Sequence, residues 1–423
     1  MTAQPSPAEA DPAASGGPAA APPAGGLMSH AGFVRFWLSR VLSALGYQIA
    51  AVAIGWHVYA KTGSAYHLGL IGLAQFVPMV LLTFVVGQIA DRFDRRRIVM
   101  LCQALQAATL AAVAIGVVAD WLSVPMIFAA VALLGAARAF EHPTFSALLP
   151  ALLPADLLAR ALAISSSAMQ TATIIGPSVG GLLYVFGAGV PLTLGAACFA
   201  AASAMTALIS VERAPPSREP VTFHSVFSGV LFIRSRPLIL GTLSLDLFAV
   251  LLGGIAALLP IFARDILDTG PWGLGLLRSA PAVGAIAMSF VLMRLPMHRH
   301  VGLKMFAAVI VFGLCTIGFA VSTNIYLSLA ALVVMGAADN VSVVIRNALV
   351  LLSTPDEMRG RVNAVNSLFI GASNQLGDFE SGMVAGLVGA VPAGIIGGIG
   401  TVLVALLWMR LFPAVRRAQT LSG

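Results

Sequence analysis

The chain has 423 residues, of which 59% are hydrophobic and 10% are charged, and its mean hydropathy is +0.94. An ordinary soluble domain is about 25% charged and far less apolar, so this composition excludes a soluble globular protein. It predicts an all-α integral membrane protein, since lipid offers the backbone no hydrogen-bond partner outside the helix. The net charge of +7 does not indicate a nucleic-acid partner, because the basic residues flank apolar segments.

Several kinds of chemistry find no support in the sequence. The three cysteines, Cys102, Cys198 and Cys315, each lie in an apolar stretch without ligand-like spacing. No G-x-x-x-x-G-K-[ST] loop is present to hold ATP, and no catalytic constellation is recognisable. We therefore expect no disulfide, no metal site, no cofactor and no enzymatic activity.

Residues 1–26 consist mainly of Pro, Ala and Gly with two acids. Such a segment buries too little apolar surface to offset the entropy of ordering, so we expect a disordered cytoplasmic tail. The tail lacks the basic start and apolar core of a signal peptide, and we expect it to remain on the mature protein.

Twelve apolar stretches follow, each long enough to cross a bilayer as a helix. In chain order they are Trp37–Tyr59, Leu68–Ala90, Ile98–Ala119, Val124–Ser146, Leu162–Phe186, Val190–Ser210, Leu238–Ala263, Trp272–Leu295, Leu303–Val321, Ile325–Leu349, Val362–Val388 and Pro392–Phe412. Six fall in residues 27–211 and six in residues 238–412, which predicts two six-helix bundles. A linker at 212–237 joins them, and a cytoplasmic tail follows at 413–423.

The basic residues orient these spans. With the N-terminus placed in the cytoplasm, about twenty of the 24 basic residues lie on the cytoplasmic side or at helix ends. Lys61 and Arg264 fall on the outer side, and Arg138 and Arg278 lie within spans. The positive-inside rule therefore predicts that both termini are cytoplasmic. All five tryptophans lie near span ends, as an interfacial belt requires.

The linker ERAPPSREPVTFHSVFSGVLFIRSRP, Glu212–Pro237, begins with a polar, Pro-containing part. Its second part alternates apolar residues with His224, Arg234 and Arg236. This pattern predicts an amphipathic helix at the cytoplasmic surface.

A shift of 201 residues superimposes the two halves of the chain. The matching pairs include Gly135/Gly336, Ala136/Ala337, Ala137/Ala338, Ala147/Ala348, Leu148/Leu349, Pro154/Pro355, Arg160/Arg361, Ser166/Ser367, Gly176/Gly377 and Gly181/Gly382. Two related halves predict pseudo-twofold packing around a central cavity, the arrangement by which transporters expose one site to each side in turn.

The segment GQIADRFDRRR, Gly87–Arg97, concentrates charge between the second and third spans. Together with the six-plus-six arrangement, it resembles the major facilitator superfamily, whose signature at this place is G-x-x-x-D-[RK]-x-G-R-[RK]. Asp94 replaces the second glycine of that signature. The residues that match it are Gly87, Asp91, Arg92, Arg95 and Arg96. The segments GPSVGGLL, LLPIFARDIL and STPDEMRGRVNAVNSL resemble those of the enterobactin-exporter and macrolide-efflux branch.

This resemblance extends from Phe33 to Phe412 and implies a transporter of the bacterial cytoplasmic membrane, which we expect to be a monomer. It also implies that the five signature residues form a conformational latch. The Asp91 carboxylate could pair with Arg92 or Arg95, or accept from free N–H groups at the start of another helix. The resemblance implies the second arrangement, with the start of the eleventh span at Arg361 and Val362. Alternatively, the arginines serve only to fix topology.

Charges inside spans cost about 2.5–3.5 kcal/mol each on insertion scales, so each needs a partner or a wet cavity. In the fourth span, Arg138 and Glu141 are three residues apart and share a helix face, with His142 beside them. Either the two charges neutralise each other structurally, or they line the cavity and Glu141 or His142 exchanges protons.

The eleventh span has one polar face, made of Asn363, Asn366, Ser367, Asn374, Asp378 and Ser381. These side chains either hydrogen-bond other helices or line a cavity. We expect the three asparagines to line the cavity and Asp378 to bind protons or substrate. Further candidates for proton or substrate binding are Glu380, Asp246 and Asp339, and Arg278 is a candidate counter-ion for one of the latter two.

In the fifth span, Ser166, Gln170 and Thr173 share a face that we expect to line the cavity. Gly176 and Gly180 permit close helix packing, and Pro177 permits a bend. The GPSVG sequence also fits a hydrolase pattern, but it lies in a lipid-length helix with no strand before it. The segment resembles the antiporter motif of the superfamily, which favours export.

The expected function is proton-coupled export of small amphipathic organic molecules, drug-like or siderophore-like, by alternating access. The partners would be the substrate, protons and the lipid bilayer, with no nucleic acid. An importer or facilitator of the same fold is one alternative, and a non-transporting membrane receptor is another.

Overall fold

The structure is a computed structural model that describes residues 27–153, 155–210, 223–295 and 299–420. Within these ranges the chain is helical and forms no β-strand. The expectations for residues 1–26, for the first part of the linker and for residues 421–423 lie outside the described part of the chain.

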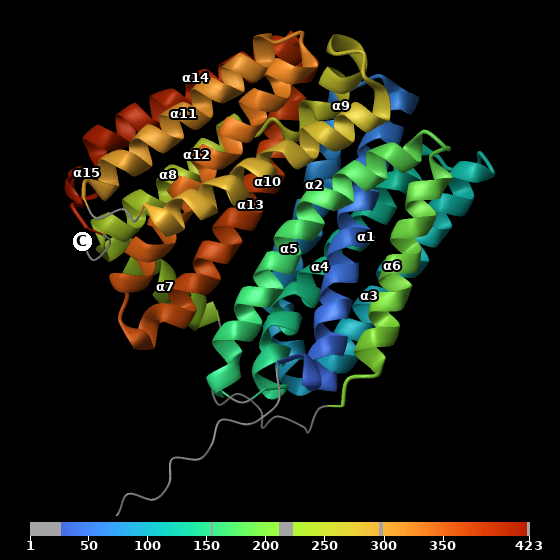
Figure 1. Ribbon diagram of the computed structural model, residues 1–423, viewed down its shortest axis with the longest axis horizontal. Coiled ribbons are helices and arrows are strands. Elements are labelled where there is room, and N and C mark those ends of the chain that lie inside the picture. The colour runs from blue at the N-terminus through green and yellow to red at the C-terminus, as the bar shows by residue number, and fades with distance from the viewer. Residues whose placement is uncertain (1–26, 154, 211–222, 296–298, 421–423) are drawn as a thin grey trace, which may run out of the picture.

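The helices form two groups that lie side by side in Figure 1, one coloured blue to green and the other yellow to red. The first group comprises α1 (Ala31–Thr62), α2 (Ala65–Arg92), α3 (Arg95–Val118), α4 (Val124–Leu148), α5 (Ala155–Tyr184) and α6 (Gly189–Ala207). The second comprises α8 (Pro237–Gly253), α10 (Gly270–Arg294), α11 (Val301–Val321), α12 (Ile325–Leu352), α13 (Asp356–Val388) and α14 (Ala390–Leu411). Short helices α9 (Leu259–Ile261) and α15 (Pro413–Arg417) complete the second group.

Ten helical segments in the described part of the chain are long and apolar enough to cross a membrane. The helices α5 and α13 are not among them, although they contain 30 and 33 residues. Both carry many polar side chains along their length. They are therefore long enough to cross a membrane but are less apolar than the other ten segments. A helix of this length that is partly polar needs protein or water, rather than lipid, against its polar face.

The seventh apolar stretch does not form the continuous helix that its composition predicts over Leu238–Ala263. The helix α8 ends at Gly253, and the chain continues as the 3-10 turn η3 (Ala256–Leu258), α9 and the π-helix η4 (Phe262–Ile266). Two adjacent glycines, Gly253 and Gly254, weaken the helix at this point. The freed carbonyl of Gly254 accepts a hydrogen bond of 2.5 Å from the Ser381 hydroxyl of α13.

The second part of the linker forms the predicted helix, α7 (Phe223–Ser235). One side of α7 packs on α13, where Gly229 lies against the backbone carbonyl of Arg361. Phe227 and Leu231 are exposed, whereas Ile233 is buried. The side of α7 that carries Phe227 and Leu231 is therefore apolar and exposed, whereas Ile233 lies on the side that contacts protein.

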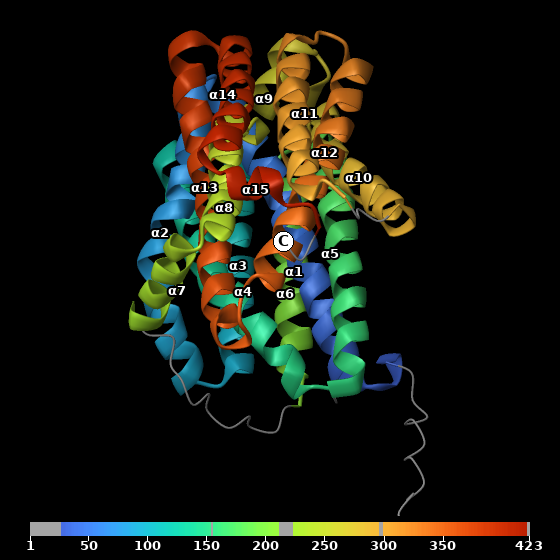
Figure 2. The ribbon, with the colours of Figure 1, turned by 90° about the vertical axis from the view of Figure 1, so that its left-hand side faces the viewer.

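The two groups meet at one end of the molecule, which carries Thr62, Tyr184 and Gly270 and is called the closed end below. Figures 1 and 2 show this end uppermost and the start of α1 at the opposite, tail end. Most of the contacts come from two helix pairs, α2 with α13 and α5 with α10. Small residues allow both approaches.

Glycines face backbone at both crossings. Gly69 of α2 lies against Gly382 of α13, and Gly275 of α10 lies against Gly181 of α5. A Cβ atom at Gly72 would come within 2.9 Å of the Asp378 Cβ. These contacts bring the helix axes together without side chains between them, as in other helix pairs that use small residues inside membranes.

This packing predicts the effect of one added methyl group. Gly382→Ala places a Cβ against the backbone of Gly69, so we expect the free energy of unfolding to fall by about 1–3 kcal/mol through overpacking. Gly318→Ala is the matched control, because no atom lies within 4 Å of its added Cβ. Unfolding of the purified protein in mixed detergent micelles measures both. Equal stability of the two variants would contradict the close approach of α2 and α13.

Candidate functional site

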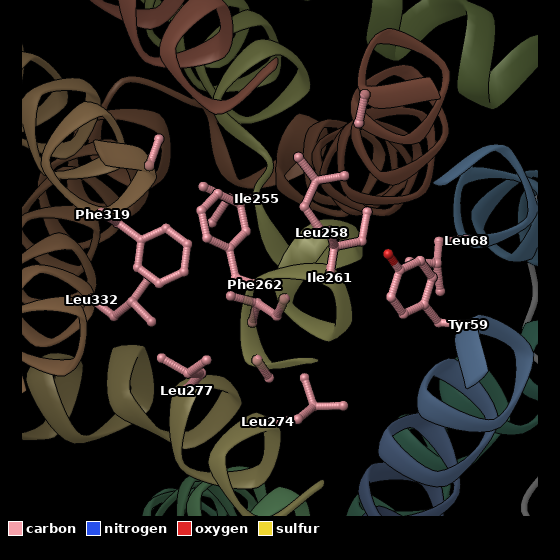
Figure 3. Close-up of a cluster of buried hydrophobic side chains, with 14 of the residues drawn as sticks. Tyr59, Leu68, Ile255, Leu258, Ile261, Phe262, Leu274, Leu277, Phe319 and Leu332 are labelled. Atoms are coloured by element: carbon pink, nitrogen blue, oxygen red, sulfur yellow. The ribbon is translucent and has the colours of Figure 1, made fainter. Parts of the chain in front are cut away.

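A cavity of about 400 Å³ lies between the two helix groups and is lined by residues of both. Most of its lining is apolar. At the closed end the cavity is bounded by a buried cluster that contains Leu68 of the first group and Ile255 and Leu332 of the second (Figure 3). The cavity is therefore sealed by side chains from two parts of the chain that are far apart in sequence.

A chain of hydrogen bonds crosses the cavity between the groups. The Tyr47 hydroxyl of α1 donates to Gln75 Oε1 of α2 over 3.0 Å. Gln375 Nε2 of α13 donates to the same oxygen over 3.2 Å. Sequence reasoning did not single out Tyr47, Gln75 or Gln375. The sequence feature that could have identified them is an amide or a phenol within an otherwise apolar span.

Asp378 and Arg278, from α13 and α10, both line the cavity. The Asp378 carboxylate accepts a hydrogen bond from the backbone N–H of Ala257 and interacts electrostatically with Arg278. This N–H is free because Ala257 lies in the first turn of η3, just after the interruption of α8. The break in the helix thus supplies a backbone donor to a carboxylate deep in the protein.

Asp339 of α12 also lines the cavity, and the part of the chain that the structure describes gives its carboxylate no hydrogen-bond or ion-pair partner. It borders a second, much smaller void of about 10 Å³, which is also lined by Asp246 and Ser342. A void of this size holds roughly one water molecule. Asp339 therefore borders both the central cavity and a small void inside the second group.

Asp246 of α8 is paired with Arg346 of α12, and not with Arg278, which the sequence offered as a counter-ion for either Asp246 or Asp339. Asp246 and Arg346 are 8% and 4% exposed, so this is a buried ion pair. Arg346 was overlooked because it lies close to the end of the predicted tenth span, where a basic residue is ordinary. In the structure α12 continues to Leu352, and the guanidinium points inward.

The predicted pair of Arg138 and Glu141 does not form, as no ion pair joins them in the described part of the chain. Glu141 is 8% exposed and faces α1 and α3 instead of the cavity. Its carboxylate accepts hydrogen bonds from the Ser43 hydroxyl at 2.6 Å and from Gln103 Nε2 and Gln106 Nε2 at 3.1 and 2.7 Å. Three neutral donors thus replace the expected arginine.

Arg138 instead stacks its guanidinium on the Tyr47 ring, 3.6 Å from the ring centroid. This cation–π contact holds the ring whose hydroxyl donates to Gln75. His142, beside Glu141, is exposed. The three charged candidates of the fourth span therefore point in three different directions.

Of the other polar candidates, Asn374 lines the cavity and donates to the Ile370 carbonyl over 2.9 Å. The residues placed outside the cavity lining are Ser166, Gln170, Thr173, Asn363, Asn366 and Glu380. Thr173 donates to the Met169 carbonyl of its own helix, and Glu380 accepts from Ser381. Their roles in transport stay predictions.

The three candidates for packing and bending in α5 face other helices. Gly176 lies against Gln48 of α1, and Gly180 lies against the backbone of Ile49. Pro177 lines the cavity, and its carbonyl lies next to Gly275 of α10. These residues place α5 close to one helix of each group.

The charged segment between α2 and α3 is described in part. Asp94 caps α3 by accepting from the Arg96 backbone N–H at 2.9 Å, which explains an acid where the signature has glycine. The arginines Arg95 and Arg96 donate to the carbonyls of Ala147 and Ile209. Arg92 is exposed, and the side-chain environments of Gly87 and Asp91 lie outside the described part.

The expected partner of Asp91 must be corrected. The helix α13 begins at Asp356, six residues before the predicted start at Val362, so the N–H groups of Arg361 and Val362 lie inside the helix. Free N–H groups occur at the first turn, after Pro355. Arg361 itself donates to the Ser228 hydroxyl of α7 over 3.3 Å.

Comparisons with known proteins agree with this architecture. Residues 24–421 match the model of the transmembrane secretion effector family, MFS_3. The enterobactin exporter EntS of Citrobacter koseri is 27% identical over 412 residues, which is 92% of this chain and 94% of that protein. The enterobactin exporter EntS of Escherichia coli O157:H7 is 26% identical over 405 residues, with the same shares covered.

Two solved structures share the fold. The nucleoside transporter NupG aligns with a TM-score of 0.67 and 15% identity over 90% of this chain and 99% of NupG. A bacterial homolog of the human lysosomal transporter Spinster, in an inward-facing and occupied conformation, aligns with a TM-score of 0.71. It is 13% identical, and the alignment covers 91% of this chain and 98% of the homolog.

The buried pair of Asp246 and Arg346 generates a stability prediction. Removing one partner leaves an uncompensated charge, so Asp246→Asn and Arg346→Gln are each expected to lower the free energy of unfolding by about 3–5 kcal/mol. The double variant should lose less than the sum, because it leaves no unpaired charge. Detergent-mediated unfolding of the parent, the two single variants and the double variant measures the coupling energy between the two residues. Strictly additive losses of unfolding free energy would contradict the ion pair.

Proposed function

Since the chain belongs to the transmembrane secretion effector family of major facilitator transporters, we propose that it exports small amphipathic organic molecules in exchange for protons. The protein is a multi-pass membrane transporter and not an enzyme. Export is supported by its similarity to enterobactin exporters, and a siderophore-like or drug-like substrate suits a cavity that is mostly apolar with a few polar groups.

We infer twelve membrane spans in two six-helix bundles, with both termini in the cytoplasm. The helices α5 and α13 complete the ten apolar spans, and each lies between the groups, against α10 and α2 respectively. In this position the polar faces of α5 and α13 contact protein and the cavity instead of lipid. The distribution of basic residues supports the orientation, with the tail end in the cytoplasm.

Alternating access is the transport mechanism that the geometry favours. The single observation that carries the proposal is a cavity lined by both groups, with ionisable side chains inside it and contacts between the groups at one end. If the closed end faces outward, the structure represents a state in which the cavity communicates with the cytoplasm. Substrate would enter there and leave after the contacts at the closed end separate.

We assign proton coupling to Asp339 and Asp378, because among the described residues these are the two whose carboxylates line the cavity. Asp246 is a secondary candidate through the small void that it shares with Asp339. An inward proton supplies about 1.4 kcal/mol per pH unit and about 2.3 kcal/mol per 100 mV. These amounts suffice to drive a tenfold or larger substrate gradient.

The transport assay uses inverted membrane vesicles with an acidic lumen and enterobactin as the substrate. With one proton exchanged per substrate, one pH unit is expected to give about tenfold accumulation in the lumen. Asp339→Asn and Asp378→Asn should abolish accumulation, because a neutral amide cannot take up the proton. Asp268→Asn is the matched control, since it makes the same change at an exposed loop position with a φ of 48° that Asn accepts.

Accumulation that does not depend on the pH gradient would contradict proton exchange. Loss of substrate from the lumen under the same gradient would show import and overturn the assigned direction. Sensitivity of a deletion strain to a compound panel, with siderophore measured in the medium, extends the assay to other substrates.

The latch at the tail end gives a separate prediction. We expect Asp91 to hold the start of α13 when the tail end closes, so Asp91→Asn should reduce the transport rate about tenfold while membrane insertion stays normal. Asp156→Asn changes an exposed acid in the first turn of α5 and is the control. Uptake rate and the amount of protein in the membrane are measured together, and an unchanged rate in Asp91→Asn would exclude the latch.

A further inference from the structure

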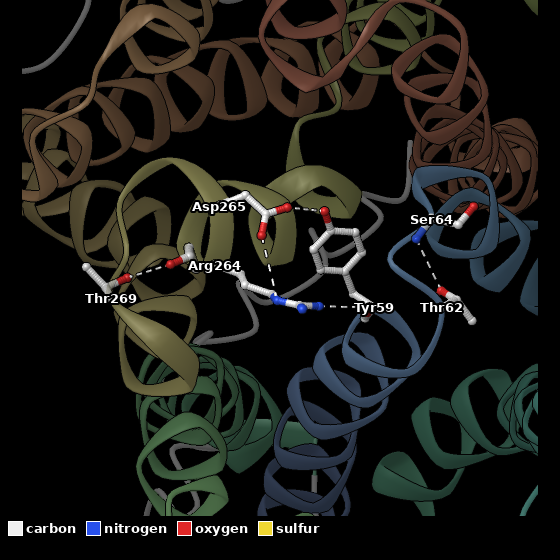
Figure 4. Close-up of polar contacts among 7 residues, drawn as sticks. Tyr59, Thr62, Ser64, Arg264, Asp265 and Thr269 are labelled. Carbon is white, nitrogen blue, oxygen red and sulfur yellow. Dashed lines mark hydrogen bonds and ion pairs between the residues drawn. The ribbon is translucent and has the colours of Figure 1, made fainter.

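A second polar cluster lies at the closed end, outside the cavity, and joins the two helix groups (Figure 4). The Tyr59 hydroxyl near the end of α1 donates to the Asp265 carboxylate of the π-helix η4. Arg264 Nη1 donates to the Tyr59 backbone carbonyl over 3.2 Å, and Arg264 Nε lies 3.7 Å from Asp265 Oδ1. Each of the three residues therefore contacts the other two, and the contacts cross the boundary between the groups.

The contact made by Arg264 has the chemistry of a helix cap supplied from another helix group. The Tyr59 carbonyl already accepts from the Gly63 backbone N–H that caps α1, over 2.8 Å, so Arg264 is its second donor. The dipole at the C-terminal end of the helix also favours a nearby cation. The guanidinium also lies 5.4 Å from the centroid of the Tyr59 ring. Arg264 is one of two basic residues that the sequence places on the outer side, as exceptions to the positive-inside rule. Its contact with the end of α1 gives a reason for this exception.

Beneath this set lies the apolar seal of the cavity (Figure 3). The Tyr59 ring, with Trp56 and Leu68, packs in one buried cluster with Phe262 and Leu274 of the second group. Tyr59 is 6% exposed, whereas the side chains of Arg264 and Asp265 are 43% and 47% exposed. Tyr59 thus belongs to the apolar seal through its ring and to the outer polar set through its hydroxyl.

The two layers must separate together when this end opens. Because Tyr59 belongs to both layers, separating the cluster also requires breaking its bond to Asp265. The half-exposed side chains of Arg264 and Asp265 can exchange their contacts for water. Such contacts are weak enough to be broken reversibly. Arg264 and Asp265 lie on a π-turn, a local irregularity that is frequent at functional sites.

We propose that Tyr59, Arg264 and Asp265 form an outer latch that holds the closed end shut and limits how often it opens. The proposal rests on the alternating-access function proposed above. The latch belongs to the opposite end of the molecule from Asp91, and neither residue of its acid–base pair lines the cavity.

The test compares two tyrosine variants that each lose one hydroxyl. Tyr59→Phe removes the bond between the groups, whereas Tyr184→Phe removes a 3.3 Å contact with His57 inside the first group and is the matched control. The reporter is Ile71→Cys, a cavity position, in a chain whose three native cysteines are replaced by serine. A bulky, membrane-impermeant maleimide is added on the closed side of oriented vesicles.

We expect Tyr59→Phe to raise the alkylation rate about tenfold, since a hydrogen bond to a charged acceptor shifts an equilibrium by about this factor. Tyr184→Phe should stay within about twofold of the parent. In an Asp265→Ala background, where alkylation is already fast, Tyr59→Phe should add nothing. This non-additivity separates a specific latch from general loosening of the fold.

Equal rates in the parent and Tyr59→Phe, with transport still present in the parent, would overturn the latch and leave the proposed function intact. Equal acceleration by both tyrosine variants would also overturn it. A parent protein that transports neither enterobactin nor any panel compound would overturn the proposed function, and the latch with it.

Discussion

A charged side chain that leaves water inside a membrane must find compensation within the protein, and this requirement organises the structure described here. Asp246 receives an arginine, and Glu141 receives three neutral hydrogen-bond donors. In the described part of the chain, Asp339, Asp378 and Arg278 have neither a close ion pair nor a full set of hydrogen-bond partners. These three residues line the central cavity. Structural charges are thus compensated inside one helix group, whereas the incompletely compensated ones gather between the groups.

The internal repeat explains how the groups meet. Gly181 and Gly382 correspond at the 201-residue shift, and each lies against a glycine of the opposite group, Gly275 and Gly69. The two crossings are therefore related contacts, one on each side of the cavity. Because their small residues leave little to interlock, such crossings can separate and form again with little rearrangement of side chains.

The chemistry of the two halves has diverged around this common frame. Arg138 and Asp339 are equivalent at the same shift, but one stacks on Tyr47 in the first group and the other lines the cavity in the second. Glu141 corresponds to Ser342, which borders the small void. The ionisable lining of the cavity comes from the second group, while the first contributes amides and a phenol.

Much of the architecture could be predicted from the sequence, because a long apolar run with few charges permits little except a membrane helix. The membership in the superfamily followed from the residues between α2 and α3 and from the six-plus-six arrangement. Individual partners could not be predicted in the same way. Asp246 meets Arg346, a residue 100 positions away, only because of how α8 and α12 are rotated about their axes.

Two other differences have local causes. The break after α8 depends on the adjacent Gly253 and Gly254, and glycines are too frequent in membrane helices to mark every break. The early start of α13 at Asp356 extends a helix beyond its apolar part, so hydropathy alone places the start too late. In both places the apolar pattern alone does not locate the end of the helix.

We propose that the two helix groups move as units, so that one end opens while the other closes. Distances between spin labels at Phe186 and Tyr326 report the closed end, and labels at Phe93 and Glu357 report the tail end; all four residues are exposed. Adding substrate to the reconstituted protein and changing the pH should lengthen one distance while shortening the other. Distances that change in the same direction, or that stay fixed while transport proceeds, would contradict the account.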